Sequence, residues 1–417
     1  MDLDQARKVV GSHAYLHGES SNGLIHRVMN APGFVNSGKT LSPASGLENG
    51  VVLRPVEALH QLAYATASRY KDDLLDIYAQ WGLLRYLGFF DLVDIKDLTR
   101  TEPPRLKVSE AGRRIVGNQR RVTSEEIGIG FGVLLARQWF ARTGAGIAPV
   151  SIIDVDAALD DRYVFAGGAR QAVRKIGKHR PDYLLVAADP QAGRRYRIRT
   201  LECKGTKNRR TAIQQLGKAV RQLDGITVDG RIPAGLATSI VASDDALSYL
   251  AIDPGDEEEP AYEFSSRMIN ETRRFRLRDD IRDQPSLALT NAAVSASWAM
   301  LADFGGNFVA RERWTPEVMR TRLRRRPRDR VRFETPFGGA RGTSVTFDFA
   351  EGQITARYAI SEAVDQELGQ GSTDRIIEAQ AAFANRLSRD DEATSLAHDN
   401  ELFSATTDGS IFSLSLR

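Results

Sequence analysis

The sequence predicts a mixed α/β protein in which a sheet flanked by helices carries a helical segment before it and a strand-rich region after it. Between residues 123 and 253, stretches with helical spacing of apolar side chains alternate with short apolar runs of strand type. After an acidic loop with Pro and Gly at 253–260, helical patterns continue to about 330 and strand patterns follow. This alternation is typical of a mixed sheet with helices on its faces.

Length and composition indicate a globular protein with more than one domain. The chain has 417 residues, which predicts several domains, and its 42% hydrophobic and 27% charged residues are those of an ordinary globular protein. Cys203 is the single cysteine, which excludes an internal disulfide and a cysteine-based zinc site. The first ten residues lack the pattern of a signal peptide, and the longest apolar stretch, 287–304, is interrupted by polar residues. We therefore expect a cytoplasmic protein without a membrane partner.

The N-terminal part divides into two segments. Residues 1–54 are rich in Gly, Ser, Asn and Pro without a sustained period, which predicts an irregular arm. From Pro55 to about 120 a helical pattern, a Leu-Gly-aromatic turn, a short strand at 106–108 and a helix start at Ser109 follow one another. This order resembles a winged-helix domain, which implies that the helix at 72–87 faces nucleic acid. A protein-interaction or dimerisation module is the alternative, and a homodimer is left open.

The remaining elements follow in chain order. The core pattern predicts a helix at 124–143, strands at 151–155, 183–187 and 196–203, a helix at 211–223 and a strand at 235–242. Beyond the acidic loop we expect helices at 263–277, 285–304 and 315–326, strands at 331–334, 344–349 and 353–360, a helix at 374–387 and a hairpin around Asp408-Gly409.

Two short motifs carry the chemistry. Arg180-Pro181-Asp182 precedes the apolar run 183–186, and twenty positions after Asp182 comes the triplet Glu202-Cys203-Lys204. Glu202 and Lys204 share one face of a strand, because strand side chains repeat every two residues, and Cys203 is expected in the core on the other face. Carboxylates of this kind hold Mg²⁺, and a neighbouring lysine can orient or deprotonate water and neutralise developing charge.

The pair of motifs resembles the signature of the PD-(D/E)xK, or restriction-endonuclease-like, nuclease superfamily. The resemblance implies a nuclease centre of Asp182, Glu202 and Lys204 that binds Mg²⁺ or Mn²⁺. It also implies a further metal-binding acid on the preceding helix, Glu125 or Glu126, and a catalytic glutamine on the following helix, Gln215. The expected domains are an irregular arm (1–54), a winged-helix-like domain (55–120), the nuclease core (121–253), a helical region (261–330) and an α+β C-terminal domain (331–417).

Basic residues indicate a polyanionic partner. The net charge is only +3, but ten arginines and three acids lie between Arg311 and Arg332. A solvated helical face is the alternative interpretation. We expect DNA contacts in two basic groups, one just after the triplet and one in this arginine-rich stretch: Lys207, Arg209, Arg210, Arg324, Arg325 and Arg326.

Taken together, the motifs favour a metal-dependent endonuclease that acts on DNA, with the setting, anti-phage defence or restriction, implied by the resemblance. A DNA-binding regulator without catalysis is the second hypothesis. A third is a nuclease subunit that needs a partner ATPase or helicase, because the chain shows no ATP-binding motif of its own.

Overall fold

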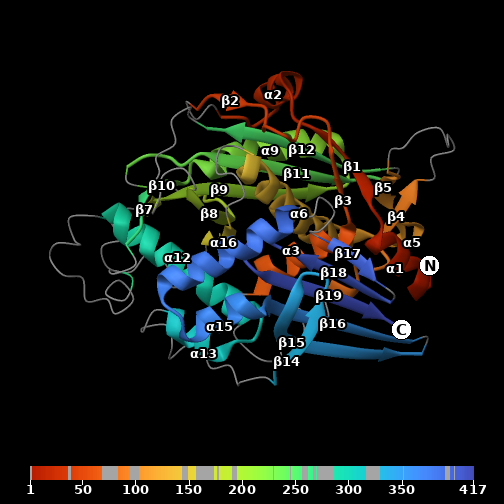
Figure 1. Cartoon of the computed structure of the whole chain (residues 1–417). Helices are drawn as coiled ribbons and strands as arrows, with labels where there is room; N and C mark the ends of the chain where they lie inside the picture. The colour runs from red at the N-terminus through yellow and green to blue at the C-terminus, as the bar shows by residue number, and fades with distance from the viewer. Residues whose placement is uncertain are drawn as a thin grey trace.

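A computed structural model shows the chain as two large sheets with helices packed around them (Figure 1). A third, small sheet is the antiparallel pair of β7 (Val173–Lys175) and β10 (Ile226–Val228). It describes residues 2–35, 39–67, 83–93, 103–142, 149–155, 173–175, 178–189, 195–228, 230–244, 246–255, 262–265, 269, 285–315, 329–350, 352–389, 395–398 and 400–417. The two termini lie on the same side of the molecule (Figure 1). Among the residues described, no helix is both long and apolar enough to cross a membrane.

The larger sheet is mixed. Its path is, in spatial order, β4 (Phe90–Val93), β5 (Arg105–Val108), β1 (Ala14–Glu19), β12 (Leu247–Pro254), β11 (Gly235–Ala242), β9 (Arg195–Thr206), β8 (Tyr183–Asp189) and β6 (Val150–Asp154). Short strands join it from the side: β2 (Leu41–Ser42), β3 (Val51–Leu53) and β13 (Tyr262–Glu263). The pairs β6–β8, β8–β9 and β11–β12 are antiparallel, and the pairs β9–β11 and β1–β12 are parallel.

Helices cover both faces of this sheet (Figure 1). On one face α9 (Arg209–Leu223) packs with α2 (Asn22–Met29), and on the other α6 (Gly117–Phe140) packs with α3 (Pro55–Ala67). The sequence of α9 explains why it forms a helix that packs on the sheet. Its apolar side chains recur at helical spacing and form one buried stripe: Ala212, Leu216, Ala219, Val220 and Leu223. Asn208 caps the helix by accepting hydrogen bonds from the backbone N–H groups of Arg210 and Thr211.

The core elements match the sequence expectation closely. The mixed sheet with flanking helices is present, β11 has the predicted bounds, and α6, β6, β8, β9 and α9 overlap their predicted ranges. The strand β12 was not predicted. It lies between β11 and β1 in the interior of the sheet.

The expectation of an irregular arm at 1–54 is wrong. Besides β1, β3 and α2, this segment contains α1 (Leu3–Gly11), and β1 pairs with β12, β3 and β5 inside the large sheet. The physical reason is long-range pairing: β1 is short and glycine-containing, and its partner β12 lies more than 200 residues away. Its local sequence therefore carries little of the information that makes it a strand.

The segment expected to resemble a winged helix is described in part. α3 begins at the predicted Pro55, β4 and β5 form an antiparallel pair, and α5 (Glu110–Arg114) is capped by the Ser109 hydroxyl. β5 also pairs with β1, so this hairpin continues the large sheet. Most of the expected nucleic-acid-facing helix at 72–87 lies outside the described residues, which resume at 83.

The C-terminal part forms a second, antiparallel sheet. Its order is β14 (Val331–Thr335), β15 (Gly338–Phe349), β16 (Gly352–Ser361), β19 (Ser410–Leu416), β18 (Glu401–Ala405) and β17 (Ser395–His398). The helices beside it are α12 (Pro285–Phe304), α13 (Phe308–Trp314), α15 (Glu362–Gln370) and α16 (Thr373–Arg389). The predicted strands, α12, α16 and the hairpin at 408–409 are all found, whereas α13 and α15 were not predicted. The segment predicted as a helix at 263–277 starts with a residue of β13; most of it, and nearly all of the one at 315–326, lies outside the described residues.

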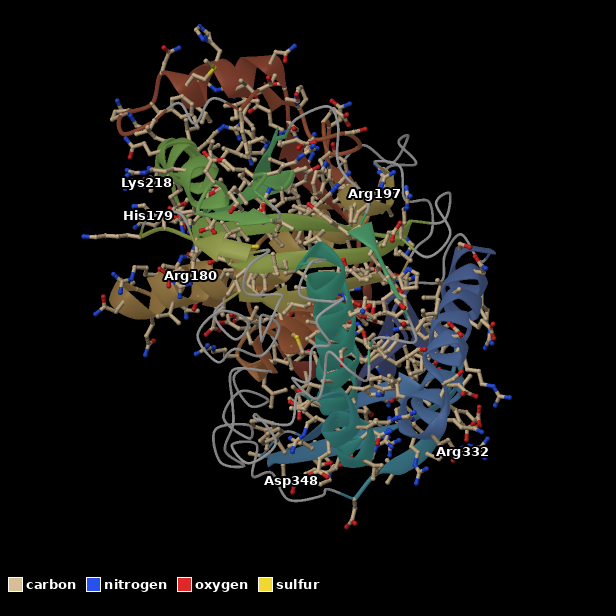
Figure 2. All side chains as sticks on the ribbon, turned by 90° about the vertical axis from the view of Figure 1, so that its left-hand side faces the viewer. His179, Arg180, Arg197, Lys218, Arg332 and Asp348 are labelled. Carbon is tan, nitrogen blue, oxygen red and sulfur yellow. The ribbon has the colours of Figure 1, made fainter. Side chains whose placement is uncertain are left out.

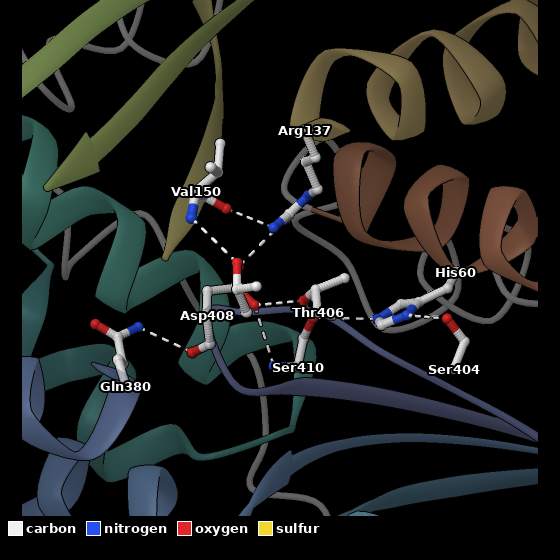
Figure 3. Close-up of polar contacts among 9 residues, drawn as sticks. His60, Arg137, Val150, Gln380, Ser404, Thr406, Asp408 and Ser410 are labelled. Carbon is white, nitrogen blue, oxygen red and sulfur yellow. Dashed lines mark hydrogen bonds and ion pairs between the residues drawn. The ribbon is translucent and has the colours of Figure 1, made fainter. Parts of the chain in front are cut away.

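A buried polar network joins the two sheets (Figure 3). Arg137 of α6 forms an ion pair with Asp408, with Nη2 and Oδ2 3.2 Å apart, and donates to the carbonyl oxygen of Val150. Asp408 also accepts from the hydroxyl of Thr406 at 2.5 Å and from the N–H of Ser410 at 3.1 Å. Because Asp408 is fully buried, these bonds fix the β18–β19 turn against the helix that packs on β9.

Candidate active site

Asp182 lies immediately before β8, next to the part of β9 that contains the triplet. The antiparallel register pairs Tyr183 with Leu201, and the N–H of Asp182 donates to the carbonyl of Leu201 at 3.1 Å. The carboxylate Oδ2 of Asp182 accepts a hydrogen bond from the N–H of Cys203 at 3.0 Å. The proline-aspartate motif and the triplet therefore meet side by side, although twenty residues separate them in the chain.

Strand alternation places Cys203 on one face of β9 and Glu202 and Lys204 on the other, as the sequence predicts. Cys203 faces α6, where a side-chain carbon added to Gly132 would lie 2.6 Å from its sulfur atom. Glu202 and Lys204 therefore point to the opposite face, the one that α9 covers. The carboxylate of Glu202 is completely buried, and the Lys204 side chain, 23% exposed, forms an ion pair with its Oε1. The site thus reaches solvent on the Lys204 side.

Helix α6 approaches β9 closely because glycines line the contact. A side-chain carbon on Gly128 would lie 2.7 Å from the carbonyl oxygen of Lys204, and one on Gly205 would collide with the backbone of Ser124. Any larger residue at either position would push the helix away from the end of β9. The backbone of the triplet is consequently held between helices on both faces.

Burial and charge shape the titration of the site. Burial, and after it the negative charge of Asp182, raises the pKa of Glu202 to about 8, although Lys204 acts in the opposite direction. For Lys204, burial alone would lower the pKa, but the charges of Glu202 and Asp182 outweigh it and raise the pKa above its ordinary value. Lys204 therefore stays protonated at neutral pH, which suits it to orient water or to neutralise a developing negative charge rather than to act as a base.

The carboxylate oxygens of Glu202 and Asp182 are ligands of the kind that a hard divalent cation prefers. Lys204 binds Oε1 of Glu202, whereas Oε2 is buried and has no hydrogen-bond partner among the residues that the structure describes. An orphaned carboxylate oxygen beside a second carboxylate, that of Asp182, is suited to Mg²⁺, which is bound through one or two carboxylates and retained waters. Across the part of the chain that is described, no group of three or more His, Cys, Asp or Glu side chains is arranged to hold a metal ion.

The helix acids implied by the resemblance have other partners. Glu126 accepts hydrogen bonds from Arg85 and from the hydroxyl of Tyr86, both just before β4. Glu125 is exposed, and its Oε1 lies 3.9 Å from Nε of Arg121, one turn earlier on α6. The structure thus brings together Asp182, Glu202 and Lys204 and leaves Glu125 and Glu126 in contacts of their own.

Gln215 lies on the α9 face of the sheet, and the structure adds a residue that sequence reasoning missed. The hydroxyl of Ser239 donates to Oε1 of Gln215 at 3.3 Å. Ser239 belongs to β11, is fully buried and is the register partner of Lys204. With Oε1 of Gln215 bound in this way, its N–H₂ group has no partner among the described residues and is available to donate. A lone serine in an apolar strand gives no signal of this in the sequence.

The basic residues expected to contact DNA divide into two groups. Lys207 and Arg210 are exposed and form no ion pair with any described residue, whereas Arg209 is bound by Glu19 of β1. Arg324, Arg325 and Arg326 lie outside the described residues. The described arginines of the same stretch bind groups of the protein itself: Arg311 binds Asp303, Arg313 binds the carbonyl of Gly371, Arg330 binds Asp365 and Arg332 binds Glu362.

Comparison with known proteins identifies no relative: no protein-family model, no curated protein and no solved structure matches this chain.

Proposed function

We propose that this chain is a magnesium-dependent deoxyribonuclease with a restriction-endonuclease-like core, in which Asp182 and Glu202 bind the metal and Lys204 assists the reaction. The observation that carries the proposal is the meeting of Asp182 with the Glu202-Cys203-Lys204 triplet on adjacent strands, where a buried oxygen of Glu202 has no partner in the described part of the chain. The biological setting that we propose, anti-phage defence or restriction, follows only from the resemblance of these motifs.

The order of elements supports the fold part of the proposal. The helix α6 precedes three antiparallel strands of the larger sheet, β6, β8 and β9, and these precede α9 and β11, which is parallel to β9. The short strands β7 and β10 intervene in the chain and pair with each other. This order places the proline-aspartate and acid-x-lysine motifs on neighbouring strands and Gln215 on the next helix, as the resemblance implies. The β4–β5 hairpin, which lies between α3 and α5 in the chain, supports a winged-helix-like unit as a DNA reader in the same way.

The chain's own residues have separate parts in the reaction. Mg²⁺, when bound, supplies a hard Lewis acid that polarises the phosphate and favours a hydroxide-like nucleophile. Glu202 and Asp182 hold it, with Glu202 in its ionised form. Lys204, protonated and partly open to solvent, orients water and offsets the charge that develops on the phosphate oxygens. The amide of Gln215 donates a hydrogen bond to the phosphate or the water.

Digestion of supercoiled plasmid and of single-stranded DNA by the purified chain tests the proposal. We expect cleavage with Mg²⁺ or Mn²⁺, none with a chelator, and a loss of at least a hundredfold in Asp182→Asn and Lys204→Ala. Asp348→Asn is the matched control, because Asp348 lies in the second sheet, where it accepts from Gln353. Wild-type protein that folds and binds DNA but cuts no substrate would refute the proposal.

A DNA-binding protein without catalysis is the second candidate, and one observation favours it. The helix acid Glu126, which would complete a three-carboxylate metal site, is held by Arg85 and Tyr86. If this candidate is correct, Asp182→Asn binds DNA as the wild type does and neither protein cleaves it. Dependence on a partner ATPase or helicase would instead show as cleavage that appears only when a cell extract is added to the wild type and not to Asp182→Asn.

A further inference from the structure

We propose that the outer face of α9, together with the loop 178–180, forms the surface along which the DNA backbone reaches the Asp182–Glu202 site. This inference rests on the proposed function and adds to it the path of the substrate. It assigns a role to Lys178, His179, Lys218 and Arg221.

The first observation is a basic stripe on α9. Arg210, Gln214, Lys218 and Arg221 recur at spacings of four, four and three residues, so they lie on one side of the helix, opposite its buried apolar stripe. At about 1.5 Å of rise per residue the stripe from Arg210 to Arg221 is about 16 Å long, enough to face roughly five phosphates spaced about 3.4 Å apart along one DNA strand.

The second observation is that the loop before Asp182 lies against the end of this helix. Gln222 donates to the carbonyl of Arg180 at 3.5 Å, and a side-chain carbon on Gly225 would collide with the backbone of His179. Lys178 and His179 are exposed there. Figure 2 shows Lys218, His179 and Arg180 gathered on one side of the molecule, whereas Arg197 and Arg332 lie on the other side.

The charges of this surface are unbalanced. From Lys207 to Gln222 the chain contains five basic residues and no acid. The first acid after it, Asp224, is bound by Lys39 at 3.3 Å. Lys178, His179, Lys218 and Arg221 form no ion pair within the part of the chain that is described. Cations left unpaired in one stripe attract a polyanion.

The basic surface lies close to the proposed active site. Arg180 lies two residues before Asp182, and Gln215, between the buried and the outer side of α9, contacts the register partner of Lys204. The loop 178–180 and Gln215 therefore connect this surface to Asp182 and to the neighbourhood of Lys204. In contrast, the described arginines between 311 and 332 bind acids and carbonyls of the protein, which makes that stretch the weaker candidate for this path.

The test is the salt dependence of DNA binding, measured by fluorescence anisotropy of a labelled duplex. The protein carries Asp182→Asn and the buffer contains a chelator, so binding is read without cleavage. We expect Lys218→Ala/Arg221→Ala and Lys178→Ala/His179→Ala each to weaken binding several-fold. The slope of log affinity against log salt should fall by about one unit for each phosphate that the variant no longer neutralises.

The matched control is Lys8→Ala/Arg375→Ala, which removes from α1 and α16 two exposed cations that form no ion pair with any described residue. We expect it to keep the full slope. An unchanged slope in both α9-surface variants, with normal folding by circular dichroism, would overturn the inference, as would a wild type that binds no DNA. A reduced slope in a protein that never cleaves DNA would support the surface and refute the nuclease proposal, so the two failures are distinguishable.

Discussion

The carboxylate of Asp182 accepts its hydrogen bond from the backbone N–H of Cys203, the middle residue of the acid-x-lysine triplet, at 3.0 Å. The backbone of the neighbouring strand thereby fixes Asp182 beside Glu202. The consequence is that the partly buried carboxylate of Asp182 lies beside the buried carboxylate of Glu202, and their mutual repulsion is built into the fold. That repulsion leads to the first two predictions.

Glu202→Gln should change how stability depends on pH in metal-free protein. The pKa of Glu202 is raised from 4.5 to about 8, so between these values the folded protein keeps a proton that the unfolded chain releases. The free energy of unfolding then falls as pH rises through this interval, by at most about 1.4 kcal/mol per pH unit. Urea unfolding with a chelator present should show a shallower fall in Glu202→Gln than in wild type. Equal slopes in the two proteins would contradict the raised pKa.

Magnesium should stabilise the protein more strongly as pH rises towards 8. Binding to the folded state alone raises the unfolding temperature, and a cation at Glu202 must compete with the proton held there at lower pH. Thermal unfolding with Mg²⁺ against chelator should show this shift in wild type and in Asp348→Asn, and lose it in Asp182→Asn and Glu202→Gln. A shift of the same size in all four proteins would place the ion elsewhere.

Much of the core could be predicted from sequence because its information is local. The apolar periods of α9, β8 and β11 predict these elements, and strand alternation alone places Cys203 opposite Glu202. The sequence motifs identify Asp182 and Glu202 as candidate site residues, but they do not show how far apart the two residues lie in space. Their adjacency depends on the register of β8 on β9, which pairs Tyr183 with Leu201.

What escaped prediction depends on contacts between distant segments. The strand β1 is recognisable only next to β12, and Ser239 matters only because the register of β11 places it beside Lys204. Glu126 is bound by Arg85 and Tyr86, which lie some forty residues earlier in the chain. Chain spacing cannot show that they reach it, so the helix acid expected near the metal was found in another contact.

The buried histidine between the sheets should make the protein sensitive to acid. His60 contacts the hydroxyls of Ser404 and Ser410 with its two ring nitrogens, at 3.0 and 3.1 Å (Figure 3). Burial, and then the charge of Arg137, lowers its pKa from 6.5 to about 3, although Asp408 acts in the opposite direction. The unfolded chain therefore takes up a proton below pH 6.5 that the folded protein excludes, and stability falls as pH decreases towards 3, by up to about 1.4 kcal/mol per unit.

His60→Gln is the variant that tests this. It should be less stable than wild type near neutral pH and should lose part of the acid sensitivity. His26→Gln, at an exposed histidine of α2, should keep the wild-type pH profile. Urea unfolding across the interval measures both, and an unaltered acid sensitivity in His60→Gln would contradict the role of this residue.

The ion pair between Arg137 and Asp408 should contribute to stability as a unit. Both side chains are buried, so Arg137→Ala or Asp408→Ala leaves an uncompensated charge and should cost about 3–5 kcal/mol of unfolding free energy. The double variant should lose clearly less than the sum of the two, as a double-mutant cycle by urea unfolding would show. The exposed pair Arg114 and Glu110 is the control and should give a coupling near zero. Additive losses at Arg137 and Asp408 would mean that the two residues act independently.

Ser239 should act on cleavage through Gln215. Removing its hydroxyl frees the Gln215 amide to rotate, which costs about one neutral hydrogen bond, or roughly 1 kcal/mol and a fivefold fall in kcat. Ser239→Ala should lower kcat with little change in KM, because the contact positions the proposed catalytic amide of Gln215 and does not itself bind DNA. In a Gln215→Ala background the same substitution should have no further effect, since the group that it positions is gone. If Ser239→Ala lowers kcat equally with and without Gln215, the serine acts through the packing of β11 and not through the amide.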